Sequence, residues 1–277
     1  MPNTVMLPEY QPKGKMRASL ARIVADTRLT LPGLMARRGA IERAASEVDD
    51  PVSFSGALRR EHVSLIAEVK RRSPSLGEIR ADLDPAAQAS QYARGGARAI
   101  SVLTDGPHFG GSSEDLRVVS STVKLPILRK DFVVEALQIT EARALGAAAI
   151  LLIVRILPPE QLKALLAFSR SIGLGALVET HTATEVVMAL DAGAEVIGIN
   201  SRDLDRFTID VPAAWALLAR VPPGVVAVAE SGMSVTADVE RAAAAGADAV
   251  LIGGALSSAP DPERLAGTLS GVRRVGR

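Results

Sequence analysis

The chain has 277 residues, 48% hydrophobic and only 3% aromatic, so it can bury a large core built mainly from Ala, Val, Ile and Leu. Its formal net charge of +1, from 32 basic and 31 acidic residues, gives no field that would favour nucleic acid or an anionic membrane as a partner. The absence of cysteine excludes disulfides, thiolate metal sites and a thiol nucleophile, and it agrees with the cytoplasmic location that we expect.

The N-terminal segment 1–20 has no continuous apolar stretch, so we expect no signal peptide. We predict that residues 1–60 form a helical extension, with helices near 15–29 and 33–48, packed on or over one end of a catalytic domain that spans 61–277. The sequence contains no run of 18 apolar residues, so we predict no transmembrane helix. The three histidines lie far apart in the chain, so we expect no metal site.

From residue 64 onward, short apolar segments rich in β-branched residues alternate with helical patterns. These segments lack polar alternation, which is typical of parallel strands buried on both faces. The predicted strands are 64–69, 99–104, 125–132, 148–154, 175–180, 195–200, 224–231 and 248–254.

The segments between the predicted strands carry helix signals. In the segment 159–168, Leu162, Leu165 and Leu166 fall on one helix face, and "SSEDLRVVSSTV" carries a similar apolar stripe. Glycine ends the helix in "ARGGARAI", "ALGAAAIL", "DAGAEVIG" and "AAGADAVL", directly before the next strand. The repeating unit is therefore one strand followed by one helix.

Eight such units predict an α/β fold, a single (β/α)8 TIM barrel with an N-terminal helical extension. The alternative is an open, doubly wound sheet, which usually carries a glycine-rich loop after its first strand. The sequence "KRRSPSLG" at that position is not such a loop, so the barrel is favoured.

Charged residues stand where several predicted strands end. Side chains two residues apart share a strand face, so these charges can be sorted into inward and outward sets. The third strand is ambiguous, because either Lys130 or the pair Arg129 and Asp131 could point inward. We predict as inward sets Glu68 and Lys70; Leu128, Lys130 and Phe132; Leu177 and Glu179; Val196, Gly198, Asn200 and Arg202; and Val228 and Glu230.

The predicted charged rim therefore contains three cations and three anions: Lys70, Lys130, Arg202, Glu68, Glu179 and Glu230. A single charged strand end usually only meets water. Five charged ends in one shared phase instead suggest acid–base chemistry on a small anionic substrate at the catalytic end of a barrel.

The last two strands end differently, with Ser231-Gly232 and Gly253-Gly254. Such glycines could merely permit tight turns, but the last two strand ends are the common phosphate site of these barrels, so we predict phosphate binding there. Phe109, on the glycine-flanked loop after the second strand, is predicted to line the ligand.

These segments resemble the indole-3-glycerol-phosphate synthase family, in family order, over roughly residues 60–256. The resemblance rests on "IAEVKRRSPSLG", "LTDGPHFGGS", "PILRKDF", "ALVETH", "IGINSRDL", "AESG" and "LIGGAL"; the first and third are the most specific. It implies a carboxy-lyase of tryptophan biosynthesis. Such an enzyme closes the ring of 1-(2-carboxyphenylamino)-1-deoxyribulose 5-phosphate, with loss of CO₂ and water and without a cofactor.

The resemblance also implies roles for single residues. Lys130 would be the general acid and Glu179 the proton acceptor for dehydration, while the division of labour between Lys130 and Lys70 stays open. Glu68 and Glu230 would hold the lysines and the substrate. The remaining contacts would come from Asn200 and Arg202 (polar groups), Ser73 (carboxylate), Phe109, Phe132 and Leu204 (aromatic ring), and Ser231, Gly232, Gly253 and Gly254 (phosphate).

Some positions depart from the family pattern. Gly254 stands where Ser or Glu is frequent, Ser201 where Asn is common, and His108 where an aromatic residue is frequent. None of these removes a predicted catalytic group. Alternatives are the same reaction on a modified anthranilate, an aminoaldose–ketose isomerase of the same barrel group, and a non-catalytic binding protein. We expect a monomer or weak homo-oligomer.

Overall fold

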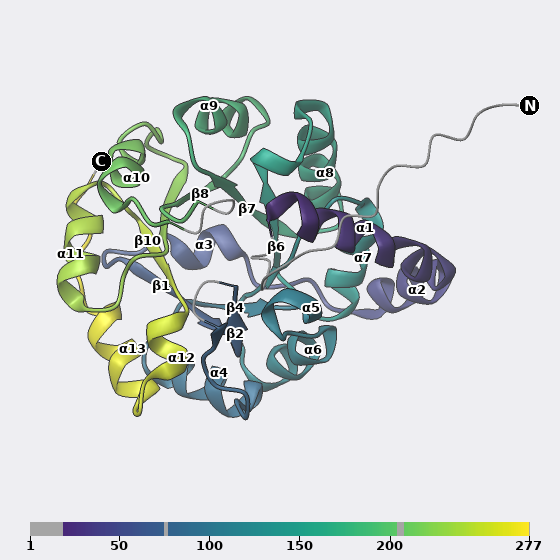
Figure 1. Ribbon diagram of the computed structural model, residues 1–277, viewed down its shortest axis with the longest axis horizontal. Helices are drawn as coiled ribbons and strands as arrows, with labels where there is room; N and C mark the ends of the chain where they lie inside the picture. The colour runs from purple at the N-terminus through teal and green to yellow at the C-terminus, as the bar shows by residue number, and fades with distance from the viewer. Residues whose placement is uncertain (1–18, 75–76, 204–207, 277) are drawn as a thin grey trace, which may run out of the picture.

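The computed structural model describes residues 19–74, 77–203 and 208–276. Eight parallel strands close into a barrel in which each strand pairs with its neighbours in chain order and β1 also pairs with β10 (Figure 1). This confirms the predicted (β/α)8 barrel. The barrel strands are β1 (Ser64–Val69), β4 (Ala99–Leu103), β5 (Ile127–Lys130), β6 (Ala149–Ile153), β7 (Gly175–Thr180), β8 (Val196–Asn200), β9 (Val226–Glu230) and β10 (Ala249–Ile252).

Helices that follow the barrel strands form the outer layer of the barrel (Figure 1). They are α4 (Pro85–Arg94), α6 (Ser113–Thr122), α7 (Ala136–Ala144), α8 (Pro159–Ser171), α9 (Ala183–Asp191), α10 (Val211–Leu218), α11 (Thr236–Ala244) and α13 (Pro262–Ser270). Shorter elements stand on the connections: the hairpin β2 (Arg72–Ser73) and β3 (Gly77–Glu78), the helices α5 (Gly106–Phe109) and α12 (Gly254–Ser258), and the 3₁₀ turn η1 (Val154–Ile156).

The glycines predicted to end the helices adopt the backbone conformation that this position demands. Gly96, Gly146, Gly193 and Gly246 have φ angles of 91°, 83°, 83° and 102°. A side chain is strained at such angles, whereas glycine is not. Each glycine therefore reverses the chain from an outer helix into the next barrel strand.

The alternation of side chains along the strands separates two hydrophobic cores. Residues on one strand face, such as Leu128, Leu177 and Val228, fill the barrel interior. Residues on the other face, such as Ile150 and Ile197, pack against the outer helices. The predicted inward phase of the fifth, sixth and seventh barrel strands is thereby confirmed, and for the third strand the structure selects Leu128, Lys130 and Phe132 as the inward set.

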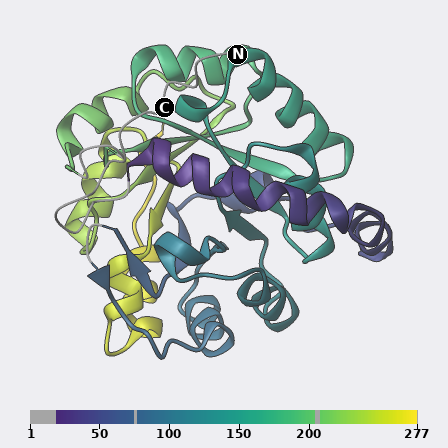
Figure 2. The same cartoon turned by 45° about the vertical axis from the view of Figure 1, so that its right-hand side comes forward.

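The N-terminal helices pack against both ends and one side of the barrel. Helix α1 (Leu20–Ala36) lies across the end where the strands finish and buries Leu20 and Ile23 with the interior cluster (Figure 2). Helix α2 (Arg38–Glu47) packs on α7. Helix α3 (Phe54–Leu58) contacts β1, β4 and β7 at their starts, where Phe54 and Leu58 close the barrel interior.

The predicted break between the first two helices is misplaced. Helix α1 continues through Pro32 to Ala36, where we had expected an interruption between residues 29 and 33. Leu34 packs with Ile41 and Leu137, and this contact holds the turn after Pro32 in helical form. The expected start near residue 15 lies outside the described residues, and the domain boundary at residue 60 stays a prediction.

Candidate active site

A cavity of about 470 Å³ opens where the barrel strands end, and the predicted site residues line it. They come from different strand ends and the loops behind them. The cavity is lined by Glu68, Lys70, Ser73, Phe109, Lys130, Phe132, Glu179, Asn200, Arg202, Glu230, Ser231, Gly232, Gly253 and Gly254, among others. Leu204, the remaining predicted site residue, lies outside the described residues.

Glu68 and Lys70 form an ion pair at the end of β1. The Nζ of Lys70 lies 2.6 Å from Oε1 of Glu68, and Ser101 donates to Oε2 from the neighbouring strand at 3.4 Å. Burial raises the pKa of Glu68, but the charges of Lys70 and Lys130 outweigh this effect and hold its pKa below the ordinary value. The pair therefore presents a carboxylate and an ammonium at neutral pH.

Gly253 makes room for this pair. A Cβ at Gly253 would collide with Oε1 of Glu68 and would lie 3.1 Å from Cε of Lys70. Ser257, one turn further along α12, accepts a hydrogen bond from the backbone N–H of Lys70 at 3.3 Å and donates one to the carbonyl of Glu68 at 3.1 Å. The end of β10 thus fixes the end of β1. Sequence reasoning missed Ser257, since a serine on a short helix carries no chemical signal.

Lys130 lies between two buried carboxyl groups. Its Nζ is 3.2 Å from Oε2 of Glu179 on β7 and 3.7 Å from Oε2 of Glu230 on β9. Burial lowers the pKa of Lys130, but the negative charges of Glu179 and Glu230 outweigh burial and raise its pKa above that of a free lysine. Lys130 is therefore an ammonium, placed to donate a hydrogen bond or a proton into the cavity.

The two carboxyl groups beside Lys130 have opposite pKa shifts. Burial raises the pKa of Glu179, but Lys130 and His181 outweigh this and leave it below the ordinary value. Burial and the negative charge of Glu179 raise the pKa of Glu230 to about 8. At neutral pH one group is therefore an acceptor and the other holds a proton. Environments that separate the pKa values of two neighbouring carboxyl groups are typical of acid–base sites.

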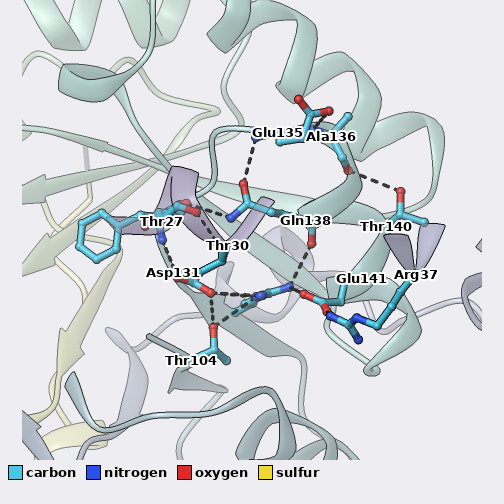
Figure 3. Close-up of polar contacts among 12 residues, drawn as sticks. Thr27, Thr30, Arg37, Thr104, Asp131, Glu135, Ala136, Gln138, Thr140 and Glu141 are labelled. Carbon is cyan, nitrogen blue, oxygen red and sulfur yellow. Dashed lines mark hydrogen bonds and ion pairs between the residues drawn. The ribbon is translucent and has the colours of Figure 1, made fainter. Parts of the chain in front are cut away.

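The outward residues of β5 anchor Lys130 from behind. Arg129 is buried and contacts Asp131 at 3.1 Å and Glu141 on α7 at 2.9 Å. Thr104 donates to the same Asp131 carboxylate, and Arg37 from the N-terminal helices contacts Glu141 at 3.0 Å (Figure 3). This network explains why three charges alternate in sequence here: Lys130 faces the cavity, while its neighbours pair with the outer layer.

Aromatic and aliphatic side chains form one wall of the cavity. The rings of Phe109 and Phe132 lie 6.1 Å apart at an angle of 36°. Asp105 caps α5, which carries Phe109, and His108 on the same short helix faces Asp26 on α1 at 3.2 Å. Leu103, Leu151 and Ile153 also line the cavity. Sorting strands by charge missed Leu151 and Ile153, because β6 ends without a charge; period-2 alternation would have found them.

The predicted substrate-carboxylate residue, Ser73, lies in the small β2–β3 hairpin and is 7% exposed. The two arginines that precede it hold this loop in place. Arg71 pairs with Asp115 on α6 at 2.5 Å, and Arg72 donates to the carbonyls of Gly106 and Pro107 on α5. The two arginines therefore fasten the loop after β1 to α6 and to the short helix that carries Phe109.

Opposite the aromatic wall, the cavity is lined mainly by backbone groups. Ser231 and Gly232, directly after β9, adopt left-handed conformations with φ of 66° and 75°. Ser231 is an unusual residue for this region, which favours glycine. A Cβ at Gly232 would lie 2.6 Å from Val211, so only glycine fits there. Successive backbone N–H groups at such turns suit an anionic group.

Two features are absent from the part of the chain that the structure describes. No group of three or more His, Cys, Asp or Glu side chains in this part of the chain could hold a metal ion. No helix among these residues is long and apolar enough to cross a membrane.

Comparison with known proteins gives one consistent family. Residues 20–269 match the model of the family described as indole-3-glycerol phosphate synthase. A protein of that name from Leptospira interrogans is 53% identical over 68% of this chain and 75% of its own length. Another from Dehalococcoides mccartyi is 44% identical over 87% of this chain and 96% of its own.

Solved structures share the fold at low sequence identity. A 3-hexulose-6-phosphate synthase superimposes with a TM-score of 0.60 and 16% identity, covering 75% of this chain and 98% of its own. A thiamine phosphate pyrophosphorylase from Pyrococcus furiosus superimposes with a TM-score of 0.58 and 14% identity, covering 76% of this chain and 95% of its own. These two likenesses concern the barrel alone.

Proposed function

The chain belongs to the indole-3-glycerol phosphate synthase family, and we propose that the cavity at its strand ends carries out that reaction, with Lys130 as the general acid and Glu179 as the proton acceptor. The enzyme converts 1-(2-carboxyphenylamino)-1-deoxyribulose 5-phosphate to indole-3-glycerol phosphate, CO₂ and water. The observation that carries the assignment of roles is the position of Lys130, whose Nζ lies in the cavity between the carboxyl groups of Glu179, at 3.2 Å, and Glu230, at 3.7 Å.

The shape and charge of the cavity suit this substrate. The Phe109 and Phe132 wall would take the anthranilate ring, with Ser73 near its carboxylate, and the backbone at Ser231, Gly232, Gly253 and Gly254 would take the phosphate. With Glu230 protonated, the three cations Lys70, Lys130 and Arg202 face two carboxylates, so the cavity favours an anionic ligand.

Condensation needs a proton donor at the substrate ketone. The ring carbon that bears the carboxylate attacks the ketone carbon, a carbon–carbon bond forms, and the ketone oxygen takes a proton from Lys130. A positioned ammonium in a water-poor cavity stabilises the negative charge that develops on this oxygen. CO₂ then leaves, and the electrons of the broken bond restore the aromatic ring, so this step needs no electron-accepting cofactor.

Dehydration needs a base and a second proton. Glu179 takes a proton from the carbon next to the ring nitrogen, the electron pair of that C–H bond forms the new ring double bond, and the neighbouring hydroxyl, protonated by Lys70, leaves as water. The low pKa of Glu179 keeps it ready to accept that proton. Lys70, held by Glu68, orients the substrate between the two steps, while Glu230, Asn200 and Arg202 hold its polar groups.

Two further proposals rest on the sequence alone. The cysteine-free composition supports a cytoplasmic enzyme, and we propose that it works as a monomer or weak homo-oligomer.

The direct test supplies wild-type enzyme with the authentic substrate. We expect indole fluorescence to rise in step with release of one CO₂ per product. Consumption of the substrate without CO₂, or no reaction although the substrate binds, would contradict the proposal. A parallel assay with ring-substituted substrates distinguishes the primary pathway from a specialised one.

A further inference from the structure

A histidine lies behind the charged rim and takes no part in the mechanism described above. His181 follows β7 directly, with a side chain that is 5% exposed, and it does not line the cavity. Its Nε2 lies 3.7 Å from Oε1 of Glu179, and its Nδ1 lies 3.5 Å from Oε2 of Glu185. These are contacts at ion-pair distance: neither ring nitrogen makes a hydrogen bond among the described residues, and the same holds for Oε1 of Glu179.

Glu185 is itself fixed in place. It lies in the first turn of α9, three residues after the N-cap Thr182. Thr182 does accept a hydrogen bond from the Glu185 N–H, but the Glu185 carboxylate accepts one from the backbone N–H of His181, at 2.6 Å. Arg155 on η1 contacts its other oxygen at 3.4 Å. The carboxylate is therefore held against the imidazole ring.

Both ring nitrogens of His181 therefore face carboxylate oxygens. An ionised carboxylate can only accept hydrogen bonds, and a neutral imidazole always has one nitrogen that is also only an acceptor. With a carboxylate oxygen opposite each nitrogen, a neutral His181 would place two acceptors face to face on one side. A doubly protonated ring would instead turn an N–H toward each oxygen, and the two negative charges would stabilise its positive charge.

We propose that His181 is a positioning residue that, as an imidazolium, holds Glu179 ionised and correctly oriented for its role as proton acceptor. The two oxygens of Glu179 are divided between two side chains: Oε1 faces His181 and Oε2 faces Lys130. His181 acts through Glu179 and does not touch the substrate. The proposal rests on the role of Glu179 proposed above.

The surrounding charges define what removal of His181 would change. Around Glu179 stand Lys130 on β5, Asn200 on β8 and Glu230 on β9. Around His181 stand Glu185 and, behind it, Arg155, which also approaches Asp203 at 3.7 Å. Burial raises the pKa of Glu179, while Lys130 and His181 lower it. Loss of the imidazolium would therefore raise the pKa of Glu179 and leave Lys130 as its main counter-charge.

The first test measures the protonation of the His181 ring directly. The chain has three histidines, so the imidazole nitrogen NMR spectrum of the ¹⁵N-labelled full-length protein contains three side chains, which single substitutions assign. We expect both nitrogens of His181 to show the imidazolium signature at neutral pH. A neutral tautomer for His181 would overturn the proposal. This result does not depend on turnover, so it separates failure of the inference from failure of the proposed function.

The second test is the pH profile of kcat for His181→Asn, with His62→Asn, an exposed histidine, as the control. We expect the acidic limb to move to higher pH by about one unit, so that turnover on that limb falls about tenfold, while KM stays within about twofold. The control should keep the wild-type profile. An equal loss of kcat at every pH, with the limb unmoved, would show a merely structural role. If His181→Asn fails to fold, His181→Gln and the NMR measurement on the wild type decide the question.

Discussion

Lys130 and Glu179 lie 49 positions apart in the chain, on strands separated by β6, and yet their side chains meet at 3.2 Å inside the barrel. Two non-adjacent strands can bring side chains together in this way because inward residues of a closed barrel share one interior. The contact joins the proposed proton donor to the proposed proton acceptor, and Glu230 joins them as a third, protonated group.

The raised pKa of Glu230 predicts a specific dependence of stability on pH. A carboxyl group whose pKa rises from 4.5 unfolded to about 8 folded binds more protons in the folded state between these values. Its contribution to the free energy of unfolding therefore falls as pH rises from 4.5 to 8, by at most about 1.4 kcal/mol per pH unit. Chemical denaturation of Glu230→Gln should lack this fall. A wild-type-like pH slope in the variant would contradict the assignment.

Replacement of Arg129 should be strongly destabilising. Arg129→Met leaves Asp131 and Glu141 buried without their shared cation, so we expect a loss of about 3–5 kcal/mol in the free energy of unfolding. Arg37→Ala is the matched control, because Arg37 also pairs with Glu141 but its own side chain is 62% exposed. This substitution should lower the free energy of unfolding by less than about 1 kcal/mol. Similar losses for both variants in denaturant titrations would refute the network shown in Figure 3.

A methyl group at Gly253 should disturb catalysis more than folding. The new Cβ of Gly253→Ala would push on Glu68 and Lys70, and a displacement of about 1 Å costs on the order of 10²-fold in kcat/KM. Gly33→Ala is the control, because a Cβ at this position on α1 would meet no other atom within 4 Å. We expect this variant to keep the wild-type kinetics and a free energy of unfolding that is equal or up to about 1 kcal/mol higher. Steady-state kinetics on both variants check this, and normal turnover by Gly253→Ala would disprove the close approach.

Phe109 should contribute to substrate binding more than to the chemical steps. Truncation in Phe109→Ala removes one ring of the apolar wall, so we expect KM to rise on the order of 10- to 100-fold, with a smaller change in kcat. Leu29→Ala, a truncation of an exposed side chain on α1, should leave both constants unchanged. A Phe109→Ala variant with wild-type KM would place the anthranilate ring elsewhere.

The alternation of side chains explains how much of the fold could be predicted. Strand β1 begins and ends where its apolar pattern does, at Ser64 and Val69, and the inward phase of Glu179 and Glu230 follows from period 2. For β5 the same rule left two choices. Arg129 points outward because it pairs there with Glu141 on α7, and no local sequence pattern predicts this contact.

The residues that escaped prediction lack a local signal. Helix α1 continues through Pro32 because of tertiary packing by Leu34, which overrides the local preference of proline to end a helix. His181 looked like an isolated histidine too far from the others for a metal site. Its importance arises only when the barrel places Glu179 on one side of the ring and Glu185 on the other.

The most direct test of the charged rim is the turnover of Lys130→Ala, measured by indole fluorescence with the authentic substrate. Binding is measured in parallel with an analogue whose ketone is reduced to an alcohol and which cannot react, and Lys163→Ala, an exposed lysine on α8, is the control. We predict that Lys130→Ala loses at least about 10²–10⁴-fold in kcat while it binds the analogue within about tenfold of the wild type. Turnover close to that of the wild type, or an equal loss of binding and rate, would contradict the assignment of Lys130 as the general acid.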